Sequence, residues 1–208
     1  MSKGHVFIIE DDESLAGSLV DILHFSGYVA RRWPQASRFL EAIPDAAPAV
    51  VLTDMRMPGL SGVQLHEALL ARGREMPVIY VSGESTVQQS VSAMKLGAVD
   101  FLLKPFSREQ LLQAVAEGVR RDRERVEALR ARAQREDALG QLSPRESEVL
   151  GLLLQGFSNA EIVDALGVAL PTAKQYKSEV MRKLDVRSLS QLMREYASAA
   201  RAPEAGAA

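Results

Sequence analysis

The stretch Val50-Val51-Leu52-Thr53-Asp54-Met55-Arg56-Met57-Pro58-Gly59 decides the fold of the chain around it. Three apolar residues and a β-branched threonine lead into one carboxylate, and a Pro-Gly pair closes the stretch. This pattern predicts a buried strand that ends at a loop tip, with Asp54 as its last residue. In open α/β sheets, ligand and phosphate chemistry takes place at the carboxyl ends of strands, so Asp54 is a candidate reactive group. The alternative at this point is an aspartate that only initiates a turn.

Residue usage limits the class of protein. The chain has 208 residues, with 47% hydrophobic and 25% charged side chains and a net charge of −2. This length predicts one large domain or two small ones, and the sequence shows no membrane-spanning apolar run and no signal-like leader. The expectation is a cytoplasmic protein without a membrane partner. The absence of cysteine excludes thiolate metal sites, and His5, His24 and His66 lack metal-ligand spacing, so they are interpreted as structural or surface residues.

Strand and helix patterns alternate five times in the first half of the chain. The expected strands are 5–9, 28–32, 50–54, 78–81 and 101–103, and the expected helices are 15–25, 36–43, 62–71 and 87–96. This alternation predicts an α/β fold, a doubly wound five-stranded parallel sheet with helices on both faces. Because parallel strands end at one edge of the sheet, the polar residues at those ends are expected to converge. They are Asp11, Asp54, Ser82 and Lys104.

The pair Glu10-Asp11 after the first strand argues against a nucleotide-binding loop. Nucleotide phosphates call for a glycine-rich turn there, and two carboxylates repel phosphate unless a cation lies between them. Mg²⁺ takes one or two carboxylates and keeps several waters, so Asp11 and Asp54 are candidate ligands. Lys104 would then bind phosphoryl oxygens and Ser82 would donate a hydrogen bond to them. Asp54 would be the nucleophile that forms an aspartyl phosphate.

Each of these residues also has a plainer interpretation. Lys104 could be an exposed loop lysine, Ser82 a turn serine, and Glu10-Asp11 a solvated helix start favoured by the helix dipole. Four chemically matched residues at four strand ends favour one common site over four coincidences.

Residues 4–120 resemble the receiver domain of two-component response regulators. The motifs that carry the resemblance are Glu10-Asp11, Asp54 with Met57-Pro58-Gly59, Ser82-Gly83, and Phe101 ahead of Lys104-Pro105-Phe106. The resemblance implies phosphotransfer from a histidine kinase to Asp54. It also implies a metal site for Mg²⁺ at Glu10, Asp11, Asp54 and the backbone carbonyl of Arg56.

The same resemblance implies a switch. Ser82 and Phe101 would form the switch pair, and because Phe101 has no hydroxyl, burial of its ring would have to report the change. A cis peptide bond is implied between Lys104 and Pro105. In receivers the positions of Arg56 and Glu84 tend to tune the lifetime of the phosphoryl group.

From Ser107, a candidate N-cap, to about Asp137 the sequence predicts one long helix without proline. Apolar residues recur every seven positions at Leu112, Val119, Val126 and Ala133, with Val115 and Leu129 between them. A weak parallel coiled coil and a solvated helix held by i,i+4 pairs both fit this pattern. The expected division is a receiver at 1–120, a helical linker at 121–140, a DNA-binding domain at 141–200 and a disordered tail at 201–208.

The last segment predicts a small all-α domain of four helices. The expected helices are 144–155, 159–166, 171–184 and 188–199, the first with Ser143 at N-cap, Pro144 at N1 and Glu146 at N3. The tight connection at 167–170 is typical of a helix-turn-helix. No catalytic constellation is present among these residues.

Bulk charge does not indicate nucleic acid, because residues 141–208 carry eight basic and eight acidic side chains. The third helix and its exit are locally basic, however, with a charge of +3 from Lys174, Lys177, Arg182, Lys183 and Arg187 against Glu179 and Asp185. A recognition helix needs cations for phosphates and polar groups for base edges. The predicted DNA-binding residues are Thr172, Lys174, Gln175, Tyr176, Lys177, Ser178, Lys183 and Arg187. A helical bundle with a merely solvated basic stripe is the alternative.

Residues 141–200 resemble the LuxR-type DNA-binding domain, so the whole chain resembles a NarL/FixJ-type response regulator. The resemblance is carried by residues 142–146, 156–162, 172–174 and 181–187. The chain departs from the family pattern at Ala160, at Ala169-Leu170-Pro171, and at Glu179 within the recognition helix. These departures predict a phosphate affinity below that of the average relative.

The expected function is a transcription regulator that phosphorylation of Asp54 switches towards dimerisation and promoter binding. Val91 and Lys95 are expected on the dimer face, and the expected partners are a sensor histidine kinase, double-stranded promoter DNA, a second copy of the chain and, as a further candidate, RNA polymerase. An enzyme is the first rival, but phosphatases with an Asp nucleophile use a second acid two residues on, where this chain has Arg56, which cannot donate a proton. The other rival is a phosphorylation-independent DNA-binding or adaptor protein with a vestigial receiver.

Overall fold

The computed structural model describes residues 2–83 and 87–197. These residues form two compact units, and the boundary between them along the chain falls between Ala128 and Leu129. Glu84 and the expected tail at 201–208 lie outside the described residues.

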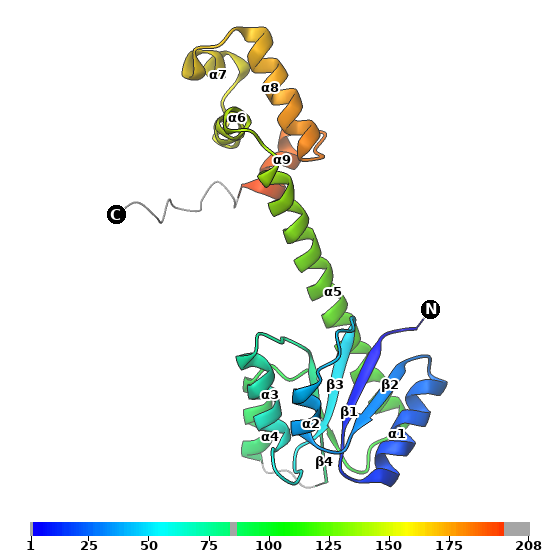
Figure 1. Ribbon diagram of the computed structural model, residues 1–208. Coiled ribbons are helices and arrows are strands. Elements are labelled where there is room, and N and C mark those ends of the chain that lie inside the picture. The colour runs from blue at the N-terminus through cyan, green and yellow to red at the C-terminus, as the bar shows by residue number, and fades with distance from the viewer. Residues whose placement is uncertain (1, 84–86, 198–208) are drawn as a thin grey trace. The chain divides into compact units, whose positions relative to one another are not determined.

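The first unit is built on one five-stranded sheet (Figure 1). The strands are β1 (His5–Ile9), β2 (Val29–Trp33), β3 (Ala49–Asp54), β4 (Val78–Ser82) and β5 (Asp100–Leu103). They are all parallel, in the order β2-β1-β3-β4-β5. The predicted doubly wound parallel sheet is therefore confirmed. Strand ends differ from the predictions by a residue or so, because hydrogen bonding to the neighbouring strand, and not hydrophobicity, sets where a strand stops.

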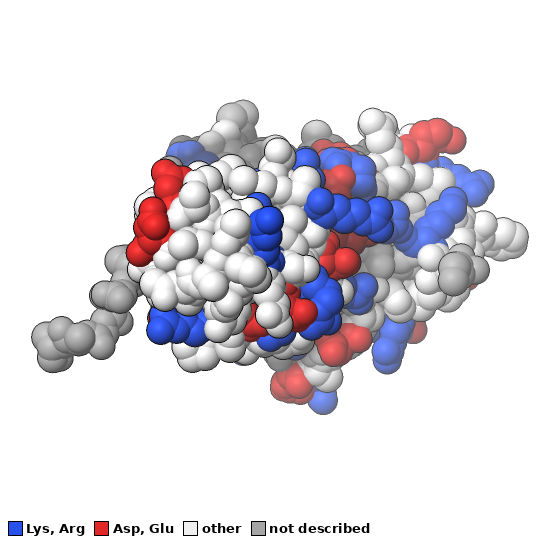
Figure 2. All heavy atoms as spheres, turned by 90° about the horizontal axis from the view of Figure 1, so that it is seen from above, with Lys and Arg blue, Asp and Glu red and all other residues white. Residues whose placement is uncertain are grey.

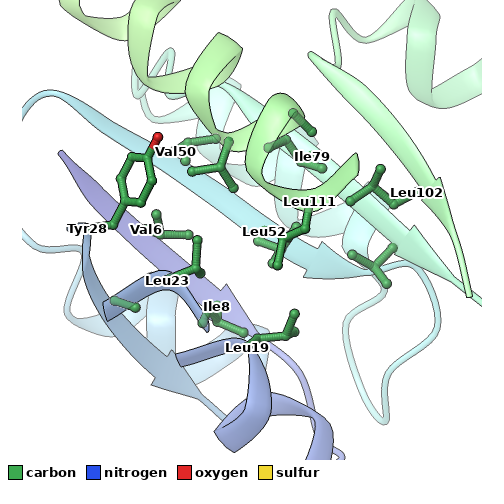
Figure 3. Packing of buried hydrophobic residues seen from close by; sticks show 14 of the residues in the cluster. Val6, Ile8, Leu19, Leu23, Tyr28, Val50, Leu52, Ile79, Leu102 and Leu111 are labelled. Carbon is green, nitrogen blue, oxygen red and sulfur yellow. The ribbon is translucent and has the colours of Figure 1, made fainter. Parts of the chain in front are cut away.

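Helices cover both faces of the sheet. They are α1 (Glu13–Phe25), α2 (Ala36–Glu41), α3 (Gly62–Ala71), α4 (Val87–Lys95) and α5 (Arg108–Gly140). One core joins alternate residues of the strands to α1 and α5, including Val50, Leu52 and Leu111 (Figure 3). A second core joins the opposite face, with Val51, to α2, α3 and α4. The unbroken apolar run of β3 follows from this burial on both faces.

The first half of α5 packs closely on the sheet. A Cβ at Gly118 would lie 2.6 Å from Val50 Cγ2, so the helix approaches β3 more closely than any other residue would allow. One turn further on, Asp122 is buried and its carboxylate accepts a hydrogen bond from the backbone N–H of Ala49 at 2.7 Å. The charge of Asp122 is balanced by Arg125 at 2.7 Å. The start of β3 is thereby fastened to α5.

The heptad pattern of α5 serves mainly the core of the first unit. Val115 and Val119 are buried against the sheet and Leu112 packs on the same core, whereas Leu129 is 52% exposed. Between these positions, ion pairs three or four residues apart line the helix, such as Arg120 with Glu124 at 2.6 Å. This arrangement favours the helix held by i,i+4 pairs, since only the later heptad positions remain for a coiled coil.

The second unit contains the last turns of α5 and four short helices. They are α6 (Pro144–Leu154), α7 (Asn159–Leu166), α8 (Leu170–Lys183) and α9 (Leu189–Tyr196). Ser143 and Glu146 form the expected capping box at the start of α6, and Ser158 with Glu161 forms another on α7. Gly167 ends α7 with a positive φ of 63°, which favours glycine and sets the turn into α8. The predicted four-helix domain is confirmed.

Candidate functional site

Asp54 is the last residue of β3 and its carboxylate is hydrogen-bonded at both oxygens. Oδ2 accepts from Lys104 Nζ at 2.6 Å, and Oδ1 accepts from the backbone N–H of Arg56 at 2.8 Å. The side chain of Asp54 is 12% exposed. Because each carboxylate oxygen has two lone pairs, both oxygens keep room for one more partner. The Asp54 carboxylate is thus fixed in orientation, paired with the Lys104 ammonium and still accessible to solvent.

Lys104 follows β5 and joins two strand ends. Its ammonium also donates to Glu10 Oε2 at 2.9 Å, just after β1. Burial raises the pKa of the Glu10 carboxyl, and the Lys104 charge only partly opposes this. Burial alone would lower the pKa of Lys104, but its hydrogen bonds to Asp54 and Glu10 raise it overall, so the ammonium stays charged. Three charges from β1, β3 and β5 therefore lie in one cluster.

Ser82 and Arg56 complete the surroundings of this cluster. Asp54, Arg56, Ser82, Gly83 and Lys104 line one open hollow of about 460 Å³. Ser82 is the last residue of β4 and is 1% exposed. A small anion in the hollow would therefore meet a lysine, an arginine and a hydroxyl beside the Asp54 carboxylate.

The donors at this edge of the sheet suit a hard divalent cation. Glu10 and Asp54 lie on either side of Lys104, and Asp11 follows Glu10 with an exposed side chain. Among residues 2–83 and 87–197, no three His, Cys, Asp or Glu side chains already surround one point as a closed metal site would. Mg²⁺ does not need such a site, since it binds through one or two carboxylates and keeps its waters. The chemistry of the donor set therefore fits Mg²⁺.

Phe101 lies in β5, three residues before Lys104, and is half-buried against the second core. The peptide bond between Lys104 and Pro105 is cis, as the resemblance implied. Behind Phe101 is a contact that sequence reasoning missed, a hydrogen bond of 3.0 Å between Tyr80 and His66. No motif could have shown it, because the two residues lie on different elements and neither has a partner at fixed spacing.

The face formed by α4 and β5 has exposed apolar side chains. Val91 is 46% exposed, and Met94 and Leu103 are each 55% exposed. Lys95, at the end of α4, is exposed as well. The two residues expected at a dimer face thus lie on the surface, beside further apolar residues.

The expected recognition helix, α8, has one clearly exposed face. Lys174, Gln175, Ser178 and Arg182 are exposed, whereas Ala173 and Val180 are buried in the hydrophobic core of the second unit. Thr172 and Lys177 are half-buried at the edges of this face, and Arg187 is exposed after the helix. Tyr176 packs partly against the core, which leaves less of it for a partner.

The basic patch is smaller than the residue count suggested. Lys183 donates to Glu146 at 2.7 Å and to the carbonyl of Gln141 at 3.1 Å, so its ammonium is tied to the start of α6. Arg182 is paired with Glu179 at 2.7 Å. On the face drawn in Figure 2, basic side chains are likewise interspersed with acidic ones. The remaining cations of α8, Lys174 and Lys177, are those most suited to bind DNA phosphates.

Comparisons with known proteins agree with this architecture. Residues 6–116 match the model of the response regulator receiver domain, and residues 140–196 match that of the bacterial regulatory proteins of the luxR family. Nodulation protein W of Bradyrhizobium diazoefficiens is 39% identical, covering 93% of this chain and 85% of that protein. The transcriptional regulatory protein FixJ of the same species is 35% identical, with 93% and 94% covered. The solved structure of the response regulator StyR has a TM-score of 0.85 at 35% identity, covering 93% of this chain and 98% of that one.

The receiver fold and the family match define the class, a two-component response regulator. With its luxR-family domain and its relatives of nearly full length, the chain belongs to the NarL/FixJ type of response regulators, which regulate transcription. In the described parts of the chain, no helix is both long and apolar enough to cross a bilayer.

Proposed function

We propose that this chain is a transcription regulator switched by transfer of a phosphoryl group from a sensor histidine kinase to Asp54. The observation that carries the proposal is the contact of one ammonium, that of Lys104, with both Asp54 and Glu10, at 2.6 and 2.9 Å. An aspartate that merely initiated a turn would need no cation from another strand. The cluster instead matches what a phosphoryl acceptor requires, a fixed carboxylate beside a fixed positive charge.

The transfer needs little beyond position and charge. An Asp54 oxygen forms a bond to phosphorus while the phosphorus–nitrogen bond of the phosphohistidine breaks, and the imidazole leaves with that electron pair. Lys104 then shifts from carboxylate to phosphoryl oxygens, which it binds as a point charge. Ser82 lines the same hollow, so its hydroxyl can donate to the new phosphoryl group.

The acidic residues at the end of β1, Glu10 and Asp11, would have two roles: they would bind Mg²⁺ and would position Lys104. Mg²⁺ held by Glu10, Asp11, Asp54 and the Arg56 carbonyl would supply positive charge against the phosphoryl oxygens. Asp11 is exposed and can meet a hydrated ion from solvent, whereas Glu10 is buried and already bound to Lys104. Glu10 therefore serves mainly to hold the lysine until the phosphoryl group arrives.

Phosphorylation would change how two chains associate. Ser82 would move towards the phosphoryl group, the Phe101 ring would turn inward, and the exposed face with Val91 and Lys95 would change shape. Two chains joined there would present two α8 helices to two half-sites of promoter DNA. The exposed apolar side chains of Met94 and Leu103 beside Val91 support this face as the contact.

The proposal is tested in two measurements on the full chain. Acetyl phosphate with Mg²⁺ should add one phosphoryl mass to the parent and none to Asp54→Asn, with the exposed Asp21→Asn as the control that behaves like the parent. Size-exclusion chromatography with light scattering, with and without the phosphoryl analogue beryllofluoride, should show dimer formation only when Asp54 is present. A parent that adds no phosphoryl group but still binds promoter DNA would favour a vestigial receiver. Dimerisation of Asp54→Asn equal to that of the parent would overturn the switch.

A further inference from the structure

Tyr80 is the immediate neighbour of Phe101 in the sheet. β4 and β5 are paired so that Tyr80 lies opposite Phe101, and the two ring centroids are 6.5 Å apart. Because side chains alternate along a strand, Tyr80 also points to the same face of the sheet as Ser82, two residues later. Tyr80 therefore adjoins both residues of the proposed switch.

The Tyr80 hydroxyl is held by α3. It lies 3.0 Å from Nδ1 of His66, and the Tyr80 and His66 side chains are both buried, at 0% and 3% exposed. Burial lowers the pKa of His66 and raises that of Tyr80, so both groups are neutral at neutral pH. The nearby Glu67 opposes the first shift and adds to the second. The tautomer of the neutral imidazole sets the direction of this hydrogen bond: the Tyr80 hydroxyl donates to an unprotonated Nδ1, or a protonated Nδ1 donates to the Tyr80 oxygen.

This pair resists separation more than an exposed pair would. A hydroxyl or an imidazole nitrogen that loses its partner inside an apolar core carries the cost of desolvation without compensation. The Tyr80 ring is thus fixed at its far end by α3 and packed in the second core along its length. Phe101 is only half-buried and has no polar anchor, so it is the ring that can move.

We propose that His66 is a positioning residue of the switch, which holds Tyr80 as the fixed surface against which Phe101 packs. How far Phe101 turns inward, and hence how strongly phosphorylation favours the dimer, would depend on this hydrogen bond. The inference rests on the proposed function, because it concerns the response to a phosphoryl group on Asp54.

The test compares variants that lose the same hydrogen bond from either side. Tyr80→Phe removes only the hydroxyl and keeps the ring, His66→Leu removes the imidazole, and His66→Asn places an amide near the position of Nδ1. The quantity measured is the ratio of dimer dissociation constants without and with beryllofluoride, by analytical ultracentrifugation. Tyr80→Phe and His66→Leu should each change this ratio by about fivefold, as expected for one hydrogen bond, and the double variant should change it no further. His66→Asn should return the ratio to within about twofold of the parent.

A background without the Phe101 ring distinguishes a role of His66 in the switch from a purely structural role. In a Phe101→Leu background, Tyr80→Phe should leave the ratio unchanged, because the Phe101 ring that packs against Tyr80 is gone. An equal change with and without Phe101 would overturn the inference, as would a Tyr80→Phe variant that responds like the parent. Tyr80→Phe keeps the test decisive even if His66→Leu does not fold. A parent that fails to respond to beryllofluoride would instead overturn the proposed function itself.

Discussion

The carboxylate of Asp122, on α5, accepts a hydrogen bond of 2.7 Å from the backbone N–H of Ala49, the first residue of β3. The strand that begins at this bond ends at Asp54. The long helix is therefore fastened to the same strand that carries the candidate phosphoryl acceptor. Asp122 is 1% exposed, and Arg125 supplies the opposite charge.

Asp122→Ala should destabilise the first unit by about 2 kcal/mol, because it leaves the Ala49 N–H without a buried acceptor and Arg125 without its partner. Trp33 is the single tryptophan and lies in this unit, so its fluorescence during urea unfolding measures the change. The matched control is Glu127→Ala, an exposed acid on the same helix, which should alter stability by less than about 0.5 kcal/mol. Equal effects of the two changes would contradict a structural role for Asp122.

Mg²⁺ should stabilise the parent against heat, because an ion that binds only the folded chain shifts the unfolding equilibrium. Asp11→Asn should reduce this stabilisation severalfold, since it removes an exposed carboxylate at the end of β1. The measurement is the melting temperature of the full chain over a Mg²⁺ titration at constant ionic strength. Asp21→Asn serves as the control for a general charge effect. A Mg²⁺ response that is the same in all three chains would exclude this site.

The stability of the second unit should depend on pH through Glu146. Hydrogen bonds from Lys183 and from the Ser143 backbone lower the pKa of Glu146 to about 2, below its ordinary value. A carboxyl with a lowered pKa stabilises the folded state above its unfolded pKa, and this contribution is lost as pH falls through the folded pKa. The advantage of the parent over Glu146→Gln should therefore be complete near neutral pH and fade between about pH 5 and about pH 2.

Amide hydrogen exchange of two buried residues, Val180 in α8 and Leu184 at the C-cap of this helix, reports this effect in the second unit. Glu148→Gln is the control, because Glu148 is exposed and pairs with Arg145 on the surface. If the difference between parent and Glu146→Gln stayed constant over the whole range, the Lys183 pair would not be its source.

Much of the fold follows from pattern alone. Alternating strands and helices are enough to put Asp54 and Lys104 at one edge of the sheet, because parallel strands must end on the same side. Asp122 could not be recognised in this way. In the sequence it stands midway between Val115 and Leu129, where the seven-residue pattern calls for an apolar residue, and its burial depends on how α5 crosses β3. The pairing of Lys183 with Glu146 depends on a contact between residues 37 positions apart. The sequence shows which charges exist but not which of them neutralise one another.

That neutralisation leads to a prediction for DNA binding. Lys174 is exposed on α8, whereas the Arg182 guanidinium is held by Glu179. Lys174→Ala should weaken binding to promoter DNA and reduce the slope of log affinity against log salt by about 1, as loss of one phosphate contact does. Arg182→Ala should have a smaller effect on both quantities, because its charge is already paired.

Glu179→Gln separates the paired and free states of Arg182. It keeps the size of the side chain but removes the negative charge, so the Arg182 guanidinium becomes available to phosphate. Affinity for DNA should rise and the salt slope should steepen by up to about 1, irrespective of promoter sequence. Titrations at several salt concentrations with specific and random duplexes measure both. If Glu179→Gln leaves the slope unchanged while Lys174→Ala lowers it, Arg182 lies away from the phosphates, and the DNA contact is confined to the Lys174 side of α8.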